Sequence, residues 1–345
     1  MQTKILKVNN TKPQISAIRQ AARLIQKGEI VAFPTETVYG LGADALNPLA
    51  VKKVFEAKGR PADNPLIIHI HDKKDLKKLA RDMPKITEKI TEKFWPGPLT
   101  IVLKKSKTVP KITTGGLDTV AIRMPKNKIA SLLIKESGVP LAAPSANFFG
   151  RPSPTLAKHV SEDLSGRISM ILDGGKTRIG IESTVIDLTS KTPMLLRPGG
   201  VTLEQIEEII GTIRIHPIIK GRKSKIMHRS PGMKYKHYSP NAKIILIEGT
   251  DRNVDKKILQ LISKFKKQKK RIGIMVMQKN HAYKADMVRF VGNSPDKIAA
   301  NLFKAFREFD EGKIDIILAH GISREGLGLG IMNRLGKAAH MKIKV

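Results

Sequence analysis

Cysteine is absent from all 345 residues of the sequence. Its absence excludes disulfide bridges, thiolate-bound zinc, iron–sulfur clusters and thiol catalysis together. Aromatic residues make up only 4% of the chain, so a hydrophobic core must be built mainly from Ile, Leu, Val, Met and Ala. Hydrophobic residues nevertheless account for 41% of the sequence, which is typical of a globular protein and not of a disordered one.

Acidic residues are scarce. Asp and Glu number 30 against 63 Lys and Arg, which leaves a formal charge of +33. A field of this sign attracts polyanions such as nucleotides, pyrophosphate or RNA. A solvated, lysine-covered surface without any anionic partner has the same composition, and net charge alone does not separate these interpretations.

Long apolar runs and metal-binding patterns are missing as well. No stretch approaches the roughly 18 apolar residues of a membrane-spanning helix, and the N-terminal residues 1–5 do not begin an apolar secretory signal. The histidines do not have the spacing of zinc ligands. We therefore expect a cytoplasmic protein with no membrane contact and no metal site made by the protein alone.

The composition divides the chain into three parts. Residues 1–211 alternate short apolar segments with helical patterns, which is typical of an α/β domain with a twisted sheet. No acidic residue occurs between positions 209 and 247, and we interpret residues 212–242 as a basic interdomain linker that is long enough to act as an active-site lid. Residues 243–345 follow a β-α-β-α-β pattern, which predicts a small, parallel, doubly wound domain.

Two glycine-rich segments are similar to phosphate-binding motifs but do not satisfy them. Residues 174–177 (GGKT) match the end of a P-loop, yet Met170 stands where that motif requires glycine, so we predict a turn. Residues 326–330 (GLGLG) lack the last glycine of a dinucleotide fingerprint, and we predict a tight turn before a helix at Met332.

Three other loops bring hydroxyls, cations and glycine to the ends of predicted elements. They are residues 34–42, residues 56–61 with Lys58 and Arg60, and residues 143–147. Arg offers a bidentate fork and Lys a compact point charge to a polyphosphate, while Ser and Asn add uncharged donors. Turns with capping hydroxyls are the alternative interpretation of the first loop. Together the loops predict a phosphate site without an obvious nucleophile.

Two arginines follow apolar strands. Arg123 and Arg197 would each cost several kcal/mol if they were buried without a partner. We therefore predict an anionic partner for each, which is either a carboxylate of the protein or a ligand.

The segment Lys58-Gly59-Arg60, taken with Ser145-Ala146-Asn147, resembles the paired K-x-R and S-x-N signature of the YrdC-like family. Residues 33–41, 95–100 and 180–185 also look like blocks of this family, in the same order, and the resemblance covers residues 14–211. Residues 231–240 and the domain after them are similar to the longer, two-domain form, the threonylcarbamoyl-AMP synthases.

The resemblance implies both a fold and a reaction. The fold would be an N-terminal YrdC-like twisted mixed sheet with helices and a basic concave face, plus a small C-terminal doubly wound parallel α/β domain. The reaction would convert L-threonine, bicarbonate and ATP, with Mg²⁺, into threonylcarbamoyl-AMP and pyrophosphate. A downstream tRNA threonylcarbamoyl transferase complex would then use the product, and tRNA or another RNA is a further possible contact.

The resemblance also implies roles for individual residues. Lys58 and Arg60 would be catalytic. The threonine pocket would consist of Thr37, His69, Arg123, Ala143 and Ser183. The ATP site would consist of Arg60, Asn64, Thr119, Ser145, Asn147, Ser153, Arg197 and Tyr235.

A non-catalytic module that binds double-stranded RNA or tRNA is the alternative, because the same positive face could hold a nucleic-acid backbone without chemistry. The sequence has few aromatic residues for base stacking, which disfavours recognition of single strands. A carbamoyl-transfer maturation protein with a related domain would need zinc-binding cysteines, and the sequence has none.

Overall fold

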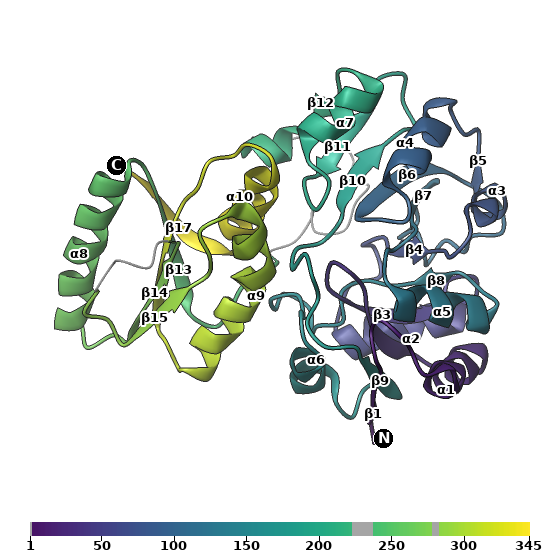
Figure 1. The fold of residues 1–345 in the computed structure, drawn as a ribbon, viewed down its shortest axis with the longest axis horizontal. Helices are drawn as coiled ribbons and strands as arrows, with labels where there is room; N and C mark the ends of the chain where they lie inside the picture. The colour runs from purple at the N-terminus through teal and green to yellow at the C-terminus, as the bar shows by residue number, and fades with distance from the viewer. Residues whose placement is uncertain (1, 223–236, 278–282) are drawn as a thin grey trace. The chain divides into compact units, whose positions relative to one another are not determined.

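A computed structural model describes residues 2–222, 237–277 and 283–345 (Figure 1). The chain forms two compact units, of which the first comprises Met1–Phe149 and Ser153–Tyr235. The second comprises Gly150–Pro152 and Lys236–Val345, so a short piece of the first half of the chain belongs to it. The predicted linker contains residues 223–236, and with them the predicted ATP ligand Tyr235, which lie outside the described residues.

The first unit is built on a mixed, twelve-stranded sheet. Its order is β1-β9-β2-β3-β8-β4-β7-β6-β10-β11-β12, with β5 paired to β6. The strands are β1 (Lys4–Lys7), β2 (Val31–Pro34), β3 (Tyr39–Asp44), β4 (Ile67–His69), β5 (Ala80–Arg81), β6 (Leu99–Lys105), β7 (Thr119–Arg123), β8 (Leu141–Ala142), β9 (Met170–Asp173), β10 (Thr184–Asp187), β11 (Met194–Arg197) and β12 (Arg214–Ile215). The sheet contains parallel pairs such as β4–β7 and antiparallel pairs such as β6–β7, which confirms the predicted mixed sheet.

Helices cover this sheet. They are α1 (Ile15–Gln26), α2 (Pro48–Lys58), α3 (Leu76–Leu79), α4 (Ile86–Phe94), α5 (Lys128–Ser137), α6 (Ala157–Leu164) and α7 (Leu203–Ile210), with 3-10 turns η1 (Lys73–Asp75) and η2 (Pro217–Lys220). Helices α1 and α5 lie side by side, and Ile18 and Leu133 pack with Phe33 in one core. Helix α1 lies between Pro13 and Gly28 and buries its apolar stripe against the sheet.

Helix α2 matters most for the site because of how it begins and ends. The Asn47 side chain accepts hydrogen bonds from the backbone N–H groups of Leu49 and Ala50, which caps the first turn. Gly59 ends the helix with φ +59°, in the left-handed conformation that glycine adopts without steric cost. This turn separates Lys58, the last helical residue, from Arg60.

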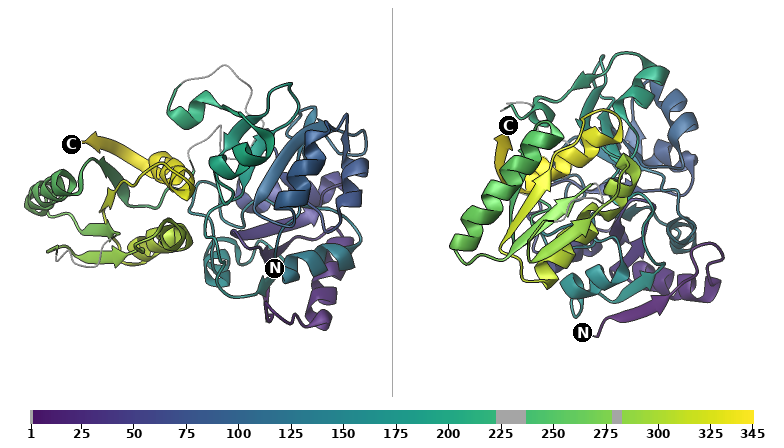
Figure 2. Two further views of the ribbon diagram at one scale, coloured as in Figure 1. Left: turned by 45° about the horizontal axis from the view of Figure 1, so that its top comes forward. Right: turned by 60° about the vertical axis from the view of Figure 1, so that its left-hand side comes forward.

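The second unit is a five-stranded parallel sheet of order β15-β14-β16-β13-β17. Its elements are β13 (Lys243–Glu248), α8 (Asp251–Lys267), β14 (Ile272–Val276), β15 (Met287–Phe290), α9 (Pro295–Glu311), β16 (Ile316–His320), α10 (Leu327–Ala338) and β17 (Ala339–Lys344). Helix α8 covers one face of the sheet, while α9 and α10 cover the other (Figures 1 and 2). The predicted doubly wound parallel domain is confirmed.

One prediction for the second unit is wrong. The predicted tight turn at residues 326–330 is the start of a helix, because α10 begins at Leu327. Gly328 allows the start of this helix to lie against the backbone of Ser323, since a Cβ atom on Gly328 would lie 2.1 Å from the Ser323 carbonyl oxygen. Within the described part of the chain, no helix combines the length and the apolar character needed to cross a membrane.

Candidate active site

A buried lysine joins the two signature segments. Lys58 is only 1% exposed, and its Nζ atom donates hydrogen bonds to the carbonyl oxygens of Ser145 at 2.5 Å and Asn147 at 2.6 Å. Burial lowers the pKa of Lys58 well below its usual value, and the charge of Arg60 acts in the same direction. The structure therefore brings Lys58, Ser145 and Asn147 together, although nearly ninety residues separate them in the sequence.

The loop that carries Ser145 and Asn147 is tightly held. The Ser145 hydroxyl donates to Asn147 Oδ1 at 2.6 Å, and the Phe149 N–H donates to the Lys58 carbonyl at 2.8 Å. A Cβ atom on Gly59 would lie 2.9 Å from the ring of Phe148. Glycine at this position thus lets the end of α2 approach the loop closely.

Arg60 organises the segment that follows it. Its Nη2 atom donates to the carbonyl oxygens of Asn64 at 3.1 Å and Pro65 at 3.0 Å, and Asn64 is itself buried. The loop that leads to Thr119 packs on this segment, because a Cβ atom on Gly115 would lie 3.0 Å from the Asp63 backbone. Thr119 opens β7, at the opposite end of that strand from Arg123.

Arg123 has a protein carboxylate as its partner. Its Nη2 atom forms an ion pair with Glu36 Oε1 at 2.7 Å, and both side chains are buried. Its Nη1 atom donates to the Thr37 hydroxyl at 3.0 Å. The sequence predicted either a protein carboxylate or a ligand as the partner of Arg123, and the structure shows a protein carboxylate. Sequence reasoning missed Glu36 as a site residue, although an acid two residues after the end of the buried strand β2 was a usable signal.

His69 lies beside Arg123 as its register partner in the β4–β7 pair. It is buried, and its Nδ1 atom lies 3.2 Å from the Ile67 carbonyl oxygen. Burial lowers the pKa of His69 to about 3, and the neighbouring Arg123 charge adds to this effect. The imidazole is therefore neutral near pH 7 and presents one donor and one acceptor nitrogen.

Arg197 and Ser183 form a second cluster. Arg197 donates from Nε to the Ser183 carbonyl at 3.0 Å and from Nη2 to the Ser183 hydroxyl at 3.1 Å. The hydroxyls of Ser183 and Thr100 lie 2.8 Å apart, and Thr100 is the register partner of Arg123 in the β6–β7 pair. Because directly opposed residues share one face of a sheet, His69, Arg123 and Thr100 point the same way from three adjacent strands. Sequence reasoning missed Thr100.

Two further predicted residues form hydrogen bonds to groups beside these clusters. The Ala143 N–H donates to the Ile67 carbonyl at 2.9 Å, which fixes the end of β8 beside β4. The Ser153 hydroxyl donates to Glu182 Oε1 at 2.6 Å, and Ser153 is buried.

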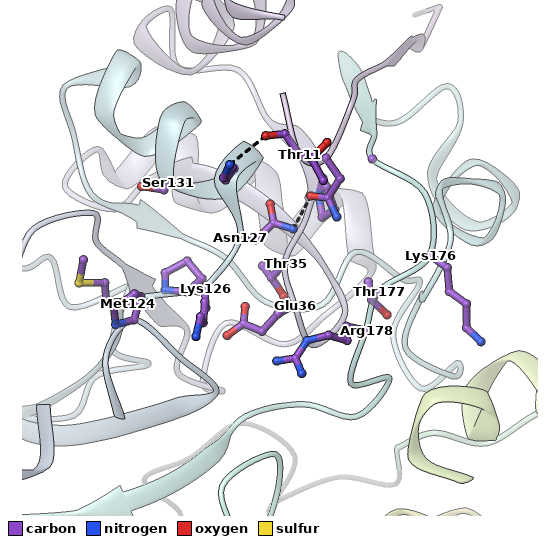
Figure 3. A pocket seen from close by; sticks show the side chains of 16 residues that line it. Thr11, Thr35, Glu36, Met124, Lys126, Asn127, Ser131, Lys176, Thr177 and Arg178 are labelled. Atoms are coloured by element: carbon purple, nitrogen blue, oxygen red, sulfur yellow. Dashed lines mark hydrogen bonds between the residues drawn. The ribbon is translucent and has the colours of Figure 1, made fainter. Parts of the chain in front are cut away.

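A cavity of about 430 Å³ adjoins the Arg123 cluster. Figure 3 shows Glu36, Lys126 and Arg178 around it, together with Lys176 and Thr177. The predicted turn at residues 174–177 is confirmed as part of the connection between β9 and β10, and it lines this cavity. None of the predicted site residues is among the lining residues, but Glu36 links the cavity to Arg123.

Over residues 2–222, 237–277 and 283–345, no group of three or more His, Asp or Glu side chains is placed to hold a metal ion. Two carboxylates at the clusters already have partners, since Glu36 pairs with Arg123 and Glu182 accepts from Ser153.

Comparison with known proteins adds two family models and several relatives. A model described as telomere recombination matches residues 23–199, and one described as the C-terminal domain of threonylcarbamoyl-AMP synthase matches residues 201–340. A threonylcarbamoyl-AMP synthase of Pyrococcus abyssi is 56% identical, covering 94% of this chain and 95% of the relative. One of Bacillus subtilis is 49% identical, covering 95% and 93%.

A solved structure is similar over nearly the whole length. The crystal structure of P. abyssi Sua5 complexed with L-threonine has a TM-score of 0.96 and 54% sequence identity, and covers 99% of this chain and 100% of that one. A YrdC-like mixed sheet joined to a parallel α/β unit is the class of protein that this fold and these clusters define. The chain belongs to the Sua5 family, the two-domain threonylcarbamoyl-AMP synthases.

Proposed function

We propose that this chain makes threonylcarbamoyl-AMP from L-threonine, bicarbonate and ATP, and releases pyrophosphate. The observation that carries the proposal is the buried convergence of Arg123, His69 and Thr37 in a fold that matches a threonine-bound relative over its whole length. The product would supply a tRNA threonylcarbamoyl transferase complex, with a tRNA contact as a further part of the proposal. We assign the chemistry to residues 1–211.

Arg123 is suited to hold the threonine carboxylate. Its guanidinium is held in one orientation by Glu36 and Thr37. The N–H groups that could bind a ligand are therefore oriented before the ligand arrives. The neutral His69 can exchange a hydrogen bond with the threonine hydroxyl without adding a second charge. Ala143 and Ser183 complete this proposed pocket.

Lys58 and Arg60 are suited to the phosphates, with Asn64, Thr119, Ser145, Asn147, Ser153 and Arg197 around the nucleotide. Two of the three Nζ donors of Lys58 are directed to the carbonyls of the S-x-N loop. The charge of an arriving polyphosphate raises the pKa of Lys58 and so favours the cationic form that stabilises it.

The proposed chemistry needs no protein nucleophile. Bicarbonate loses hydroxide to give CO₂, and the threonine amine attacks its carbon to form a carbamate. The proton that the amine loses neutralises the hydroxide, so water is released. A carbamate oxygen then attacks the α-phosphorus, the bond between the α-phosphorus and the bridging oxygen breaks, and pyrophosphate leaves. Since negative charge spreads over phosphoryl oxygens in this step, the side chains act by positioning and by electrostatic stabilisation.

Mg²⁺ would enter with the nucleotide. Because the described carboxylates near the clusters are already paired, the ion would be held by ATP oxygens and water, where it neutralises phosphate charge. The residues at this site therefore suit a complex of Mg²⁺ with the nucleotide.

The test is pyrophosphate release from ATP by the purified full chain, with threonine and bicarbonate each omitted in turn and the product identified by mass spectrometry. We expect release only when all three substrates are present. Release that does not depend on threonine and bicarbonate would refute the proposal.

A further inference from the structure

Thr100 is a fully buried residue of the first unit whose hydroxyl has one hydrogen-bond partner in the described part of the chain. It lies on β6, its exposed fraction is 0%, and its Oγ1 atom lies 2.8 Å from Ser183 Oγ. Ser183 is also fully buried. Because a buried hydroxyl proton without an acceptor costs free energy, the direction of this one hydrogen bond has consequences for the site.

Thr100 stands in the middle of a row of register partners that crosses five strands. From β11 to β4, Arg197 pairs with Val185, Val185 with Thr100, Thr100 with Arg123, and Arg123 with His69. Directly opposed residues share one face of a sheet. The row therefore joins the arginine proposed for ATP to two residues proposed for threonine, with Thr100 between them. All five strands belong to the first unit.

Arg197 occupies one of the two lone pairs of the Ser183 hydroxyl. Its Nη2 atom donates to Ser183 Oγ at 3.1 Å, while its Nε atom donates to the Ser183 carbonyl oxygen at 3.0 Å. A hydroxyl has two acceptor lone pairs and one proton. If Thr100 donates to Ser183, both lone pairs of Ser183 are filled and the Ser183 proton is left for a further acceptor. If Ser183 donates instead, the remaining proton belongs to Thr100.

The proposed function decides between these two directions. It assigns Ser183 to the threonine pocket and does not assign Thr100, so the proton that meets a ligand belongs to Ser183. The Thr100 proton is then donated to Ser183 Oγ, its acceptor among the described residues. In this arrangement both hydroxyl protons have acceptors once threonine is bound. The opposite direction would leave the Thr100 proton buried and unpaired, which is the more costly state.

We propose that Thr100 is a positioning residue for threonine: together with Arg197 it fills the lone pairs of Ser183, so that the Ser183 hydroxyl is oriented as a donor to the substrate. The inference rests on the proposed function, which places Ser183 in the threonine pocket. A group that can only donate suits a carboxylate, which only accepts, and disfavours an ammonium group, which only donates. Ser183 therefore binds the threonine carboxylate together with Arg123, the register partner of Thr100.

The experiment compares Thr100→Val, Thr100→Ser and wild type in the full chain, each with and without Ser183→Ala. Valine keeps the shape of threonine but removes the hydroxyl, while serine keeps the hydroxyl and removes a methyl group. Thr91→Val is the matched control, because Thr91 is buried and its hydroxyl donates to the Glu88 carbonyl at 3.1 Å within α4. The readouts are the Kd for threonine by calorimetry and the KM for ATP, and urea denaturation checks that each variant is folded.

We expect Thr100→Val to raise the Kd for threonine about fivefold, because the Ser183 hydroxyl loses its fixed orientation. The KM for ATP should stay within about twofold, since Arg197 keeps its hydrogen bond to the Ser183 carbonyl. Thr100→Ser and Thr91→Val should both bind threonine within about twofold of wild type. In the Ser183→Ala background, Thr100→Val should change the Kd by less than about twofold, because Thr100 acts through Ser183 alone.

An unchanged Kd for threonine in Thr100→Val overturns the inference. It is also wrong if Thr100→Ser loses as much affinity as Thr100→Val, or if the effects of Thr100→Val and Ser183→Ala add, because both results indicate a packing effect. An equal loss of threonine and ATP binding contradicts it as well. Failure of the proposed function has a separate signature, since wild type itself would then consume no ATP in response to threonine and bicarbonate.

Discussion

Lys58 shows why a buried cation can be retained at a site. A fully buried ammonium is costly, and here two backbone carbonyls offset that cost by accepting its hydrogen bonds. Those carbonyls belong to the loop whose side chains are proposed to bind ATP. The lysine thus has two roles, since it closes the S-x-N loop against α2 and it supplies charge near the phosphates.

Replacement of Lys58 tests both roles. We expect Lys58→Ala to lower synthesis by about 10²-fold or more, because it removes charge from the transition state. We also expect a loss of about 1–3 kcal/mol in the free energy of unfolding, because two buried carbonyls lose their donor. Turnover and urea denaturation measure the two effects. Lys52→Ala is the control on the same helix, since Lys52 forms an exposed ion pair with Glu56. Wild-type turnover in Lys58→Ala would remove this lysine from the mechanism.

His69 predicts a pH dependence of stability. Its pKa is about 3 in the folded chain, against a usual value of 6.5. Since the unfolded chain binds a proton more readily, the free energy of unfolding falls as the pH is lowered from 6.5 towards 3, by up to about 1.4 kcal/mol per pKa unit of difference. We expect His69→Asn to lose less stability than wild type between pH 7 and pH 4, as measured by urea denaturation. His71→Asn, two residues further on, is the control. Parallel stability curves for His69→Asn and wild type would contradict the neutral, buried imidazole.

At the scale of elements, the backbone conformation of the turn after α2 affects the candidate site directly. Gly59 and Gly175 both have positive φ angles, of +59° and +79°. A Cβ atom on Gly59 would meet the Phe148 ring, whereas one on Gly175 would meet no atom within 4 Å. Substitutions at these two glycines can therefore distinguish the effect of backbone strain from the effect of a displaced S-x-N loop.

We expect Gly59→Ala and Gly175→Ala to lose similar stability, about 1 kcal/mol each, because both place a Cβ atom in the left-handed region. The Phe148 ring can rotate away, so its displacement should cost little stability but should shift the loop next to Asn147. Turnover should therefore fall in Gly59→Ala and not in Gly175→Ala, and thermal unfolding with steady-state assays would check this. Equal turnover in the two variants would show that the approach of Phe148 to Gly59 is irrelevant to activity.

The elements also show what a sequence can and cannot predict. The bounds of β7 and β13 follow from the sequence alone, because each is an apolar run with polar neighbours. Strand β1 was missed, since it is largely exposed and its partner β9 begins at Met170, far along the chain. Helix α5 was missed although Asn127 caps its start and Gly138 ends it, so that signal was present and unused.

The candidate site also contains residues that the sequence predicted and residues that it did not. The residues that meet, such as Lys58 with the S-x-N loop, were predicted through a family resemblance that preserves spacing over long distances. The partners Glu36 and Thr100 were not predicted. Their roles depend on the register of β6 and β7 and on how a loop folds back to Arg123, and these are properties of tertiary structure.

At the scale of the whole molecule, the net charge of +33 has more than one origin. Some cations are buried and bonded to protein groups, as Lys58, Arg123 and Arg197 are. Others stand in the last turn of a helix, as Lys264, Lys266 and Lys267 do in α8, where they complement the helix dipole. Net charge is therefore a poor measure of nucleic-acid binding, and the RNA-binding alternative needs its own test.

Salt separates that alternative from catalysis. An RNA-binding surface that neutralises 6–10 phosphates should lose about 10³-fold or more in affinity between 50 and 200 mM salt, because binding releases condensed counterions. The proposed substrates are small and their ligands are buried, so electrostatic screening over about 10 Å should affect turnover far less. We expect threonine-dependent ATP turnover to change by less than about threefold over this range, while tRNA affinity measured in the same buffers by fluorescence anisotropy falls steeply. If turnover fell in parallel with tRNA affinity, RNA binding would be part of the catalytic cycle itself. If tRNA bound tightly while no turnover occurred at any salt concentration, the positive face would serve as a nucleic-acid surface and the small-molecule site would be wrong.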